Sequence, residues 1–371
     1  MDRLKLLKGI RRAVVKIGTA VLTDENGKID RKVAQEIARQ CERMLAGDRQ
    51  VALVSSGAIA LGRAQLALET RPKKMDALQA CAAVGQSQLI RLWGEAFAPF
   101  GRTVAQVLLT HADLAHRQRF LNARRCLFEL SARGAIAVIN ENDTVSVEEI
   151  AFGDNDALSG QVANLLNADL LIMLSIAPGL LDGDRCVSEV PQGDKRIDRL
   201  IWKGRSSSGT GGMTTKVAAA RSVAARGGLA IIAPGKVPGV LDRLFAGDEL
   251  GTWFLPAPRA MSSRAQWIAH TLRAKGSLRL DPGAVEAVVA RKRSLLPTGI
   301  VGVEGNFGRG DPVDLTSPTG SVLARGLSAY SSAELGRIQG KRTREIFGIL
   351  GYHLGDEVIH RDDLVILKPS S

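Results

Sequence analysis

The chain has 371 residues, of which 45% are hydrophobic and 24% charged, and its formal net charge is +12 at pH 7. This composition excludes a disordered, collagenous or low-complexity protein, and at about 150 residues per domain the length predicts two domains or three. The basic excess favours anionic partners such as phosphates, nucleotides, carboxylates or nucleic acid, and a solubilising surface charge explains it equally well.

The basic charge is unevenly distributed along the chain. Residues 277–371 hold 12 Lys and Arg against 11 Asp and Glu, whereas residues 1–276 hold 38 against 27. The excess therefore lies almost wholly in the first part of the chain.

Cysteine usage and apolar runs bear on the cellular compartment. Cys41, Cys81, Cys126 and Cys186 are widely spaced and form no CxxC, which favours free thiols over disulfides or zinc ligands. The basic N-terminus lacks the continuous apolar stretch of a signal peptide, and the longest apolar run, residues 170–177, is too short to span a bilayer. We therefore expect a soluble, cytoplasmic protein without membrane association.

The first part of the chain alternates short apolar runs with helical patterns. The runs at 13–17, 51–54, 104–109, 135–139, 170–174 and 229–233 are typical of buried strands. Apolar residues at every fourth position predict a helix over 31–45, and further helical stretches occupy 79–97, 119–133, 157–166 and 217–226. The alternation predicts an α/β fold in which helices sandwich a mainly parallel sheet.

The pattern changes near residues 261–274. After Lys275 come short segments punctuated by Gly, Pro and Asp, with one helical stretch at 282–291. This is typical of a small, mostly β domain. We expect a catalytic domain over residues 1–275 and a second domain over 276–371.

Two strand-to-helix turns could bind anions. Lys16 ends the first predicted strand and is followed by Gly18, so it could reach phosphate above the sheet; the alternative is a lysine extending from an edge strand. The small residues 55–62 follow the second strand and would expose backbone amides, or they simply make a tight serine-capped turn. Neither turn matches GxGxxG or a P-loop.

Two polar clusters and one glycine-rich loop follow. Residues 140–143 and 152–156 place acids and amides on successive loops, where they could bind an ammonium group, orient lysines or hold a divalent ion; the alternative is a pair of helix-capping Asx turns. The loop GTGGMTTK, residues 209–216, opens a helix and suits a polyphosphate, unless it is a flexible surface loop.

Seven segments resemble, in order, the amino acid kinase family. They read VVKIGTAVLT, ALVSSGAIALGR, ACAAVGQSQLI, QVLLTHAD, RFLNARRCL, VINENDTVSVEEIAFGDNDALS and GTGGMTTK. The lines SSGAIALG, AAVGQ, INENDTV and FGDND are similar to the branch that phosphorylates glutamate. The tail resembles a PUA domain, chiefly in GAVEAVVARKRSLLPTGIVGVEGNFGRGDPVDL and ARGLSAYSSAEL. The resemblance covers almost the whole chain.

The resemblance implies an activity. Members of this branch transfer phosphate from ATP to the γ-carboxylate of L-glutamate, giving glutamyl 5-phosphate, as the first step of proline biosynthesis. It also implies Mg²⁺ bridging the ATP phosphates without a closed protein metal site, and a homo-oligomer. The alternative is a catalytically weak kinase-like protein that binds RNA or a regulator through the PUA domain. The nearly neutral, aromatic-poor tail gives RNA binding no support.

The resemblance also assigns roles by position. Lys16 and Lys216 would be catalytic lysines that bind the phosphate oxygens, and Asp156 would orient both. Ser56, Asp143 and Asn155 would bind glutamate. The nucleotide would contact Lys16, Gly18, Gly57, Ser175, Ile176, Gly209, Thr210, Gly211, Gly212, Met213, Thr214, Thr215 and Lys216.

Three positions depart from the family pattern. Ala20 stands where the first loop usually has Ser or Thr. After the fifth strand the family usually reads T-D-x-x-G-L-Y, whereas here Ile176 replaces the acid and Leu181 replaces the tyrosine. That loop commonly contacts the base and ribose, so the substitutions bear on the strength and base selectivity of ATP binding.

Overall fold

The computed structural model describes residues 2–145, 154–200, 212–257, 265 and 267–367. Contacts divide the chain into two compact units, Met1–Ala260 and Met261–Ser371. The segment Trp267–Thr271 belongs to the second unit, where the Arg325 guanidinium donates to the carbonyls of Ala269 at 3.3 Å and Leu272 at 2.6 Å. The domain boundary expected near residue 275 stays a prediction.

The first unit is built on an eight-stranded sheet in the order β3-β4-β2-β1-β5-β9-β10-β8. The first six strands in this order are parallel, and β10 runs antiparallel to β9. All the predicted strands are present, and the sheet confirms the predicted fold class. The strands are β1 (Arg12–Ile17), β2 (Gln50–Ser55), β3 (Val104–Leu109), β4 (Ile136–Glu141), β5 (Leu170–Ser175), β8 (Glu189–Val190), β9 (Leu229–Pro234) and β10 (Thr252–Phe254).

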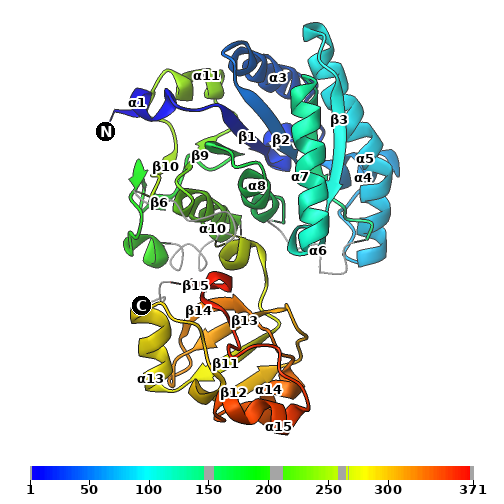
Figure 1. Cartoon of the computed structure of the whole chain (residues 1–371). Helices are drawn as coiled ribbons and strands as arrows, with labels where there is room; N and C mark the ends of the chain where they lie inside the picture. The colour runs from blue at the N-terminus through cyan, green and yellow to red at the C-terminus, as the bar shows by residue number, and fades with distance from the viewer. Residues whose placement is uncertain (1, 146–153, 201–211, 258–264, 266, 368–371) are drawn as a thin grey trace. The chain divides into compact units, whose positions relative to one another are not determined.

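Helices cover both faces of this sheet (Figure 1). α3 packs on β2 and against α5 and α11, whereas α7, α8 and α10 pack on the other face. Between strands the chain forms α1 (Arg3–Leu7), α2 (Thr19–Leu22), α3 (Arg31–Ala46), α4 (Ala58–Gln65), α5 (Met75–Phe97), α6 (His111–Ala115), α7 (Arg117–Ala132), α8 (Asp154–Leu165), α10 (Gly212–Ala225) and α11 (Val240–Phe245), with a small hairpin of β6 (Leu181–Asp182) and β7 (Arg185–Cys186). In the described part of the chain, no helix has the length and apolar character needed to cross a membrane.

Local sequence explains where these elements begin. The Asp30 side chain accepts from the backbone amide of Lys32 and caps α3, and buried Ile37 and Cys41 give that helix its apolar face. The apolar residues of β1 are buried on both sides, as expected for a central strand between two helical layers. Sequence patterns missed β8 and β10 because runs of two and three residues show no period.

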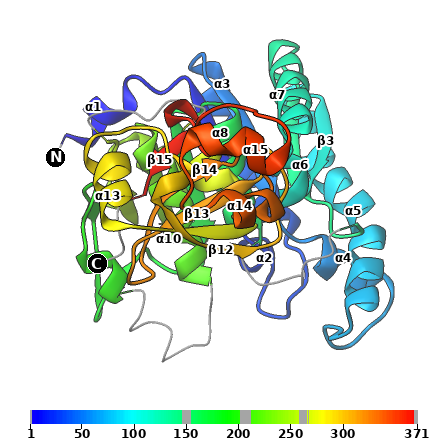
Figure 2. The same ribbon diagram turned by 60° about the horizontal axis from the view of Figure 1, so that its bottom comes forward.

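Helices α4 and α5 lie side by side in direct backbone contact (Figure 2). A Cβ on Gly85 of α5 would overlap the Ala58 carbonyl and the Gly62 amide, and a Cβ on Gly62 would overlap the Cys81 carbonyl. The two glycines therefore allow a helix separation that no side chain would permit. Since α4 begins directly after Ser56 and Gly57, this crossing fixes the position of that turn.

The second unit contains a five-stranded sheet in the order β12-β11-β13-β14-β15. Its strands are β11 (Gly276–Leu280), β12 (Ile300–Gly305), β13 (Pro312–Thr316), β14 (Val322–Leu327) and β15 (Leu364–Ile366), accompanied by α13 (Pro282–Val285), α14 (Ser332–Ile338) and α15 (Ile346–Leu350). Buried Leu278, Val313, Tyr330 and Ile338 lie in its core. The mostly β architecture expected of the tail is confirmed.

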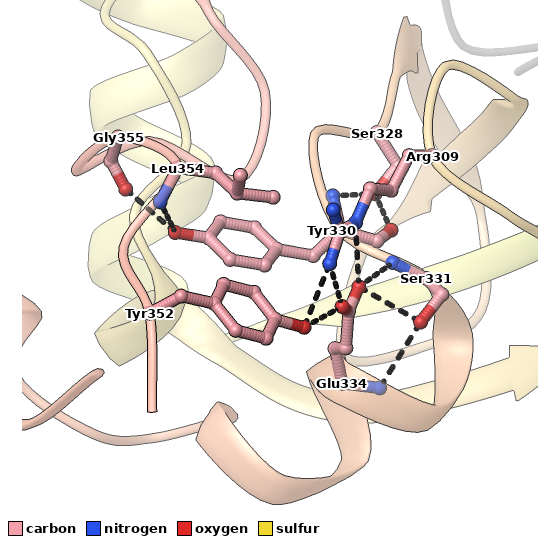
Figure 3. A network of polar contacts seen from close by, with 8 residues as sticks. All are labelled: Arg309, Ser328, Tyr330, Ser331, Glu334, Tyr352, Leu354 and Gly355. Carbon is pink, nitrogen blue, oxygen red and sulfur yellow. Dashed lines mark hydrogen bonds and ion pairs between the residues drawn. The ribbon is translucent and has the colours of Figure 1, made fainter. Parts of the chain in front are cut away.

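A polar network in this unit is organised by Glu334 (Figure 3). Its carboxylate accepts from the Ser331 backbone amide at 2.6 Å, and its own amide donates to the Ser331 hydroxyl at 3.4 Å, which completes a capping box at the start of α14. The carboxylate also accepts from the Ser331 hydroxyl at 2.8 Å and contacts the Arg309 guanidinium and the Tyr352 hydroxyl. The hydrogen bond from Arg309 is the largest cause that lowers the pKa of Glu334, to about 2. Tyr330 lies alongside and donates to the Gly355 carbonyl at 2.8 Å.

We expect Glu334→Gln to lower the melting temperature of the second unit at neutral pH and to flatten its acid dependence. A carboxylate whose pKa is lower folded than unfolded stabilises the fold above its ordinary pKa, here 4.5, and the stabilisation is lost as pH falls toward about 2. Thermal unfolding between pH 7 and 3 measures the gap between variant and wild type, which should narrow below about pH 4.5. A gap that stays constant over this pH range would contradict this role.

Candidate active site

The candidate site lies where the parallel strands end. Lys16 is in β1, Ser56 follows β2, Asn140 is in β4 and Ser175 ends β5. In the register of the sheet, Lys16 is the Cα partner of Val54 and Met173, so these strand ends reach the same edge. Helices α8 and α10 carry Asp156 and Lys216 near their N-terminal ends. This edge is where open α/β sheets bind ligands.

Asp156 joins two lysines that are 200 residues apart in sequence. Its Oδ1 lies 2.5 Å from Nζ of Lys16, and its Oδ2 lies 2.9 Å from Nζ of Lys216. The side chains are 1%, 6% and 13% exposed for Asp156, Lys16 and Lys216, so little water screens the three charges. Each carboxylate oxygen of Asp156 contacts one ammonium group, so Asp156 holds the two lysine side chains on either side of its carboxylate. The cluster retains one net positive charge.

The pKa of the Lys16 amine lies below its ordinary value. Burial lowers its pKa, the nearby positive charge of Lys216 lowers it further, and the Asp156 carboxylate opposes both effects. A buried cation without full compensation is strongly favoured to meet an anion. The arrangement is therefore suited to hold phosphate oxygens between two ammonium groups.

Thr215, in the first turn of α10, also contacts Asp156. The Thr215 hydroxyl lies 3.0 Å from Oδ2 of Asp156 and 3.1 Å from the Gly212 carbonyl. The Lys216 ammonium also donates to the Gly212 carbonyl, at 3.1 Å. These contacts hold the end of the glycine-rich segment, and hence Lys216, against α8.

A chain of amides connects the other predicted residues. Nδ2 of Asn155 donates to the Ser56 hydroxyl and to Oδ1 of Asn140, both at 2.9 Å. Nδ2 of Asn140 donates at 2.8 Å to Oε1 of Gln86, a buried residue of α5 whose Nε2 has no hydrogen-bond partner within the described structure. The Glu141 amide donates to Oδ1 of Asn155 at 3.3 Å. Because Asn155 precedes Asp156 on α8, the amide chain and the lysine cluster form one site.

The two glycines at the site differ in what they require. Gly57 has φ of 121° directly before α4, a conformation that L side chains rarely adopt, so this turn depends on glycine. Gly18 has φ of −76°, and a Cβ there would lie 3.5 Å from Nζ of Lys16 and from the Leu174 carbonyl, an ordinary contact. Gly18 therefore keeps space beside the lysine rather than relieving backbone strain.

Comparison with known proteins decides the family. The model of the amino acid kinase family matches residues 11–233, and that of the PUA domain matches residues 276–350. The chain belongs to the amino acid kinase family. The chain aligns with carbamate kinase from Giardia lamblia bound to AMP-PNP with a TM-score of 0.50 at 16% identity. The alignment covers 67% of this chain and 99% of that one and shows a shared fold alone.

Within the amino acid kinase family, the similar curated proteins are glutamate 5-kinases. The glutamate 5-kinase of Myxococcus xanthus is 49% identical over 368 residues, which cover 97% of each chain. That of Syntrophotalea carbinolica is 46% identical over 373 residues, covering 99% of this chain and 100% of its own. The match thus includes both units.

The structure brings most of the predicted kinase residues together, and part of the prediction falls outside its described residues. Lys16, Asp156, Lys216, Ser56 and Asn155 form the connected site above. Gly212, Met213, Thr214 and Thr215 begin α10, whereas Gly209, Thr210 and Gly211 lie outside the described residues. Asp143 is half-buried after β4, and the following residues 146–153 are likewise outside the described part.

Sequence reasoning gave no role to Gln86 and named Asn140 only as a member of the polar cluster 140–143. The signal available was the AAVGQ line, in which Gln86 directly follows the glycine that allows the α4–α5 crossing. Asn140 and Gln86 are 54 positions apart, so only the fold shows that they touch. In the loop that departs from the family pattern, Ile176 directly follows β5 and is 66% exposed, whereas Leu181 begins β6 and is 41% exposed. The Ser175 hydroxyl accepts from the Ala177 amide at 3.3 Å.

Proposed function

We propose that the protein transfers the γ-phosphoryl group of ATP to the γ-carboxylate of L-glutamate, releasing ADP and glutamyl 5-phosphate, the reaction that opens proline biosynthesis. The observation that carries the proposal is Asp156 holding Lys16 and Lys216 at the end of the sheet, in a chain nearly half identical to glutamate 5-kinases over its full length. We expect this activity to occur in the cytoplasm and in a homo-oligomer.

Each residue of the proposed active site has its own role in the reaction. The γ-carboxylate is already ionised at neutral pH, so attack on the γ-phosphorus needs no general base, and the β–γ bridging oxygen leaves with ADP. Lys16 and Lys216 neutralise charge on the transferring group, and Asp156 keeps both in place without accepting a proton. Ser56 and Asn155 hold glutamate through hydrogen bonds, and Asp143 pairs with its ammonium group.

Magnesium fits this site as a companion of ATP. Among the described residues, no group of three His, Cys, Asp or Glu side chains could hold a metal ion, and both oxygens of Asp156 face lysines. We propose that ATP phosphate oxygens and water coordinate the ion. When bound, Mg²⁺ neutralises part of the phosphate charge.

The nucleotide is proposed to lie along the ends of β1 and β5 and the start of α10. Gly18, Gly57 and the glycine-rich segment supply space and backbone amides to the phosphates. Exposed Ile176 and Leu181 present apolar surface where the family usually has an acid and a tyrosine, so base recognition lacks a carboxylate hydrogen bond. We therefore expect weak discrimination between ATP and GTP.

ADP release by the purified protein tests this proposal. With Mg²⁺-ATP, ADP should form only when L-glutamate is present, and L-aspartate should be a poor replacement because its shorter side chain moves the carboxylate away from the lysines. GTP serves as the second donor and reports on the loop at Ile176. A folded protein that releases no ADP with either donor would refute the kinase assignment.

We expect Asp143→Ala to raise the KM for glutamate by about tenfold or more, with kcat changed little, because it removes a charge partner of the substrate ammonium in ground and transition state alike. Steady-state kinetics with varied glutamate at saturating ATP measures this. The matched control Asp24→Ala, in an exposed turn, should leave KM unchanged. Loss of ATP binding with an unchanged glutamate KM would contradict the assigned role.

A further inference from the structure

A cavity of about 470 Å³ lies at the opposite edge of the large sheet, where β1, β2 and β4 begin. It is lined by Arg11, Arg12, Arg49 and Arg102, together with one acid, Asp48. We call it the arginine pocket. Its volume falls in the range of about 300–1,000 Å³ that is common for small-molecule sites. Its arginines account for part of the excess of basic residues that lies outside the active site.

Among the described residues, the guanidinium groups of three of the four arginines form no ion pair with an acidic side chain. Arg102 is bound through two nitrogens by Glu42, at 2.8 and 2.7 Å. In the described part of the chain, no carboxylate forms an ion pair with the guanidinium of Arg11, Arg12 or Arg49. Their like charges converge on one cavity, and Asp48, the acid in its described lining, cannot balance all of them, so the cavity favours an anionic ligand.

Two guanidinium groups are held in fixed orientations. Arg49 lies over the ring of Phe245, at 4.9 Å from the centroid, and its Nε is buried without a hydrogen-bond partner. Arg12 lies over Phe128 at 5.3 Å and donates to the Leu166 carbonyl at 2.7 Å. Stacked guanidinium planes are prepared to bind phosphate or carboxylate, since less side-chain entropy is lost on binding.

The pocket also has an apolar side. Buried Val51 and Ile136 belong to its lining, at the starts of β2 and β4. A ligand with a carbon skeleton between anionic groups would contact the arginines through its anionic groups and the apolar side chains through its carbon atoms. A nucleic-acid strand fits less well, because arginines already cover the faces of Phe128 and Phe245 on which bases could stack.

We propose that the arginine pocket binds a small organic polyanion carrying two or more phosphate or carboxylate groups. It is distinct from the active site, because Arg12 begins the strand that ends beyond Lys16 and a six-residue strand is roughly 20 Å long. The proposal does not depend on the proposed kinase activity.

Calorimetric titration of the full chain with pyrophosphate and with citrate, at 0.15 M salt, tests the proposal. The titrations use the Lys216→Ala protein, so that weakened phosphate binding at the active site does not obscure a second site. In this background Arg49→Gln should weaken binding by about tenfold or more, because a charge-assisted hydrogen bond is lost. Arg11→Gln, at an exposed position where folding is not at risk, should also weaken binding. Arg125→Gln, exposed on α7 outside the lining, is the matched control.

Each outcome has a defined meaning. Saturable binding of pyrophosphate alone supports a phosphate-bearing ligand, and binding of citrate alone supports a polycarboxylate. If neither probe binds, or if both arginine variants bind as tightly as their parent, the proposal is wrong. Salt-sensitive binding of single-stranded RNA with both probes silent would also overturn it and would point to a nucleic-acid surface.

Discussion

Replacing Lys216 by alanine is expected to lower kcat by about a thousand-fold or more, while the KM for glutamate changes little. The ammonium group is held 2.9 Å from Asp156 and aimed, with Lys16, at the point where charge moves between ATP oxygens in the transition state. Stabilisation felt mainly in the transition state appears in kcat rather than in substrate binding. Initial rates of glutamate-dependent ADP release measure the loss.

A control on the same helix separates catalysis from folding. Arg221 is part-exposed on α10, where it pairs with Asp198, so Arg221→Ala should retain nearly full activity. Lys216→Ala should also keep a cooperative unfolding transition, because the Lys216 side chain lies in a polar cluster with Asp156 and the Gly212 carbonyl rather than in the apolar core. A Lys216→Ala protein with unchanged kcat would remove the central residue from the proposed mechanism.

Gly85→Ala is expected to destabilise the first unit by about 3 kcal/mol. The added Cβ would overlap backbone atoms of Ala58 and Gly62, which cannot rotate away as a side chain can, so α4 and α5 must separate. That movement also displaces Gln86 from Asn140 and shifts the turn at Ser56. Urea unfolding should therefore show a lower midpoint, and the KM for glutamate should rise.

The same helix provides the matched control. A Cβ on Gly94 of α5 would meet nothing within 4 Å, so Gly94→Ala should be neutral or stabilise the fold by up to about 1 kcal/mol through higher helix propensity. If Gly85→Ala changed the urea midpoint and the KM for glutamate as little as Gly94→Ala does, the close α4–α5 crossing would not determine the position of the turn at Ser56.

The strands and much of the site could be predicted because their signals are local. The six apolar runs match β1, β2, β3, β4, β5 and β9, and the family-like turns carry Lys16, Asp156 and Lys216 to the sheet edge where the structure joins them. The short strands β8 and β10 could not be predicted, because their pairing depends on distant parts of the chain.

Contacts between residues that are far apart in the sequence could not be predicted. Gln86 looks like an ordinary polar residue of a helix until the fold brings it to Asn140. Likewise, Arg12, Arg49 and Arg102 each read as a surface charge, and only the starts of neighbouring parallel strands place them around one cavity. Nothing in the local sequence marks Gly62 and Gly85 as the positions where the backbones of two helices touch.

The most direct test is to identify the acyl phosphate itself. The protein is incubated with Mg²⁺-ATP, L-glutamate and hydroxylamine, and the trapped product is analysed by mass spectrometry for the carboxyl group that carries the hydroxamate. We expect the γ-hydroxamate of glutamate, formed in equal amount to ADP and strongly reduced with Lys216→Ala. An α-hydroxamate, or ADP release without any hydroxamate, would contradict phosphoryl transfer to the γ-carboxylate at the Lys16–Asp156–Lys216 site.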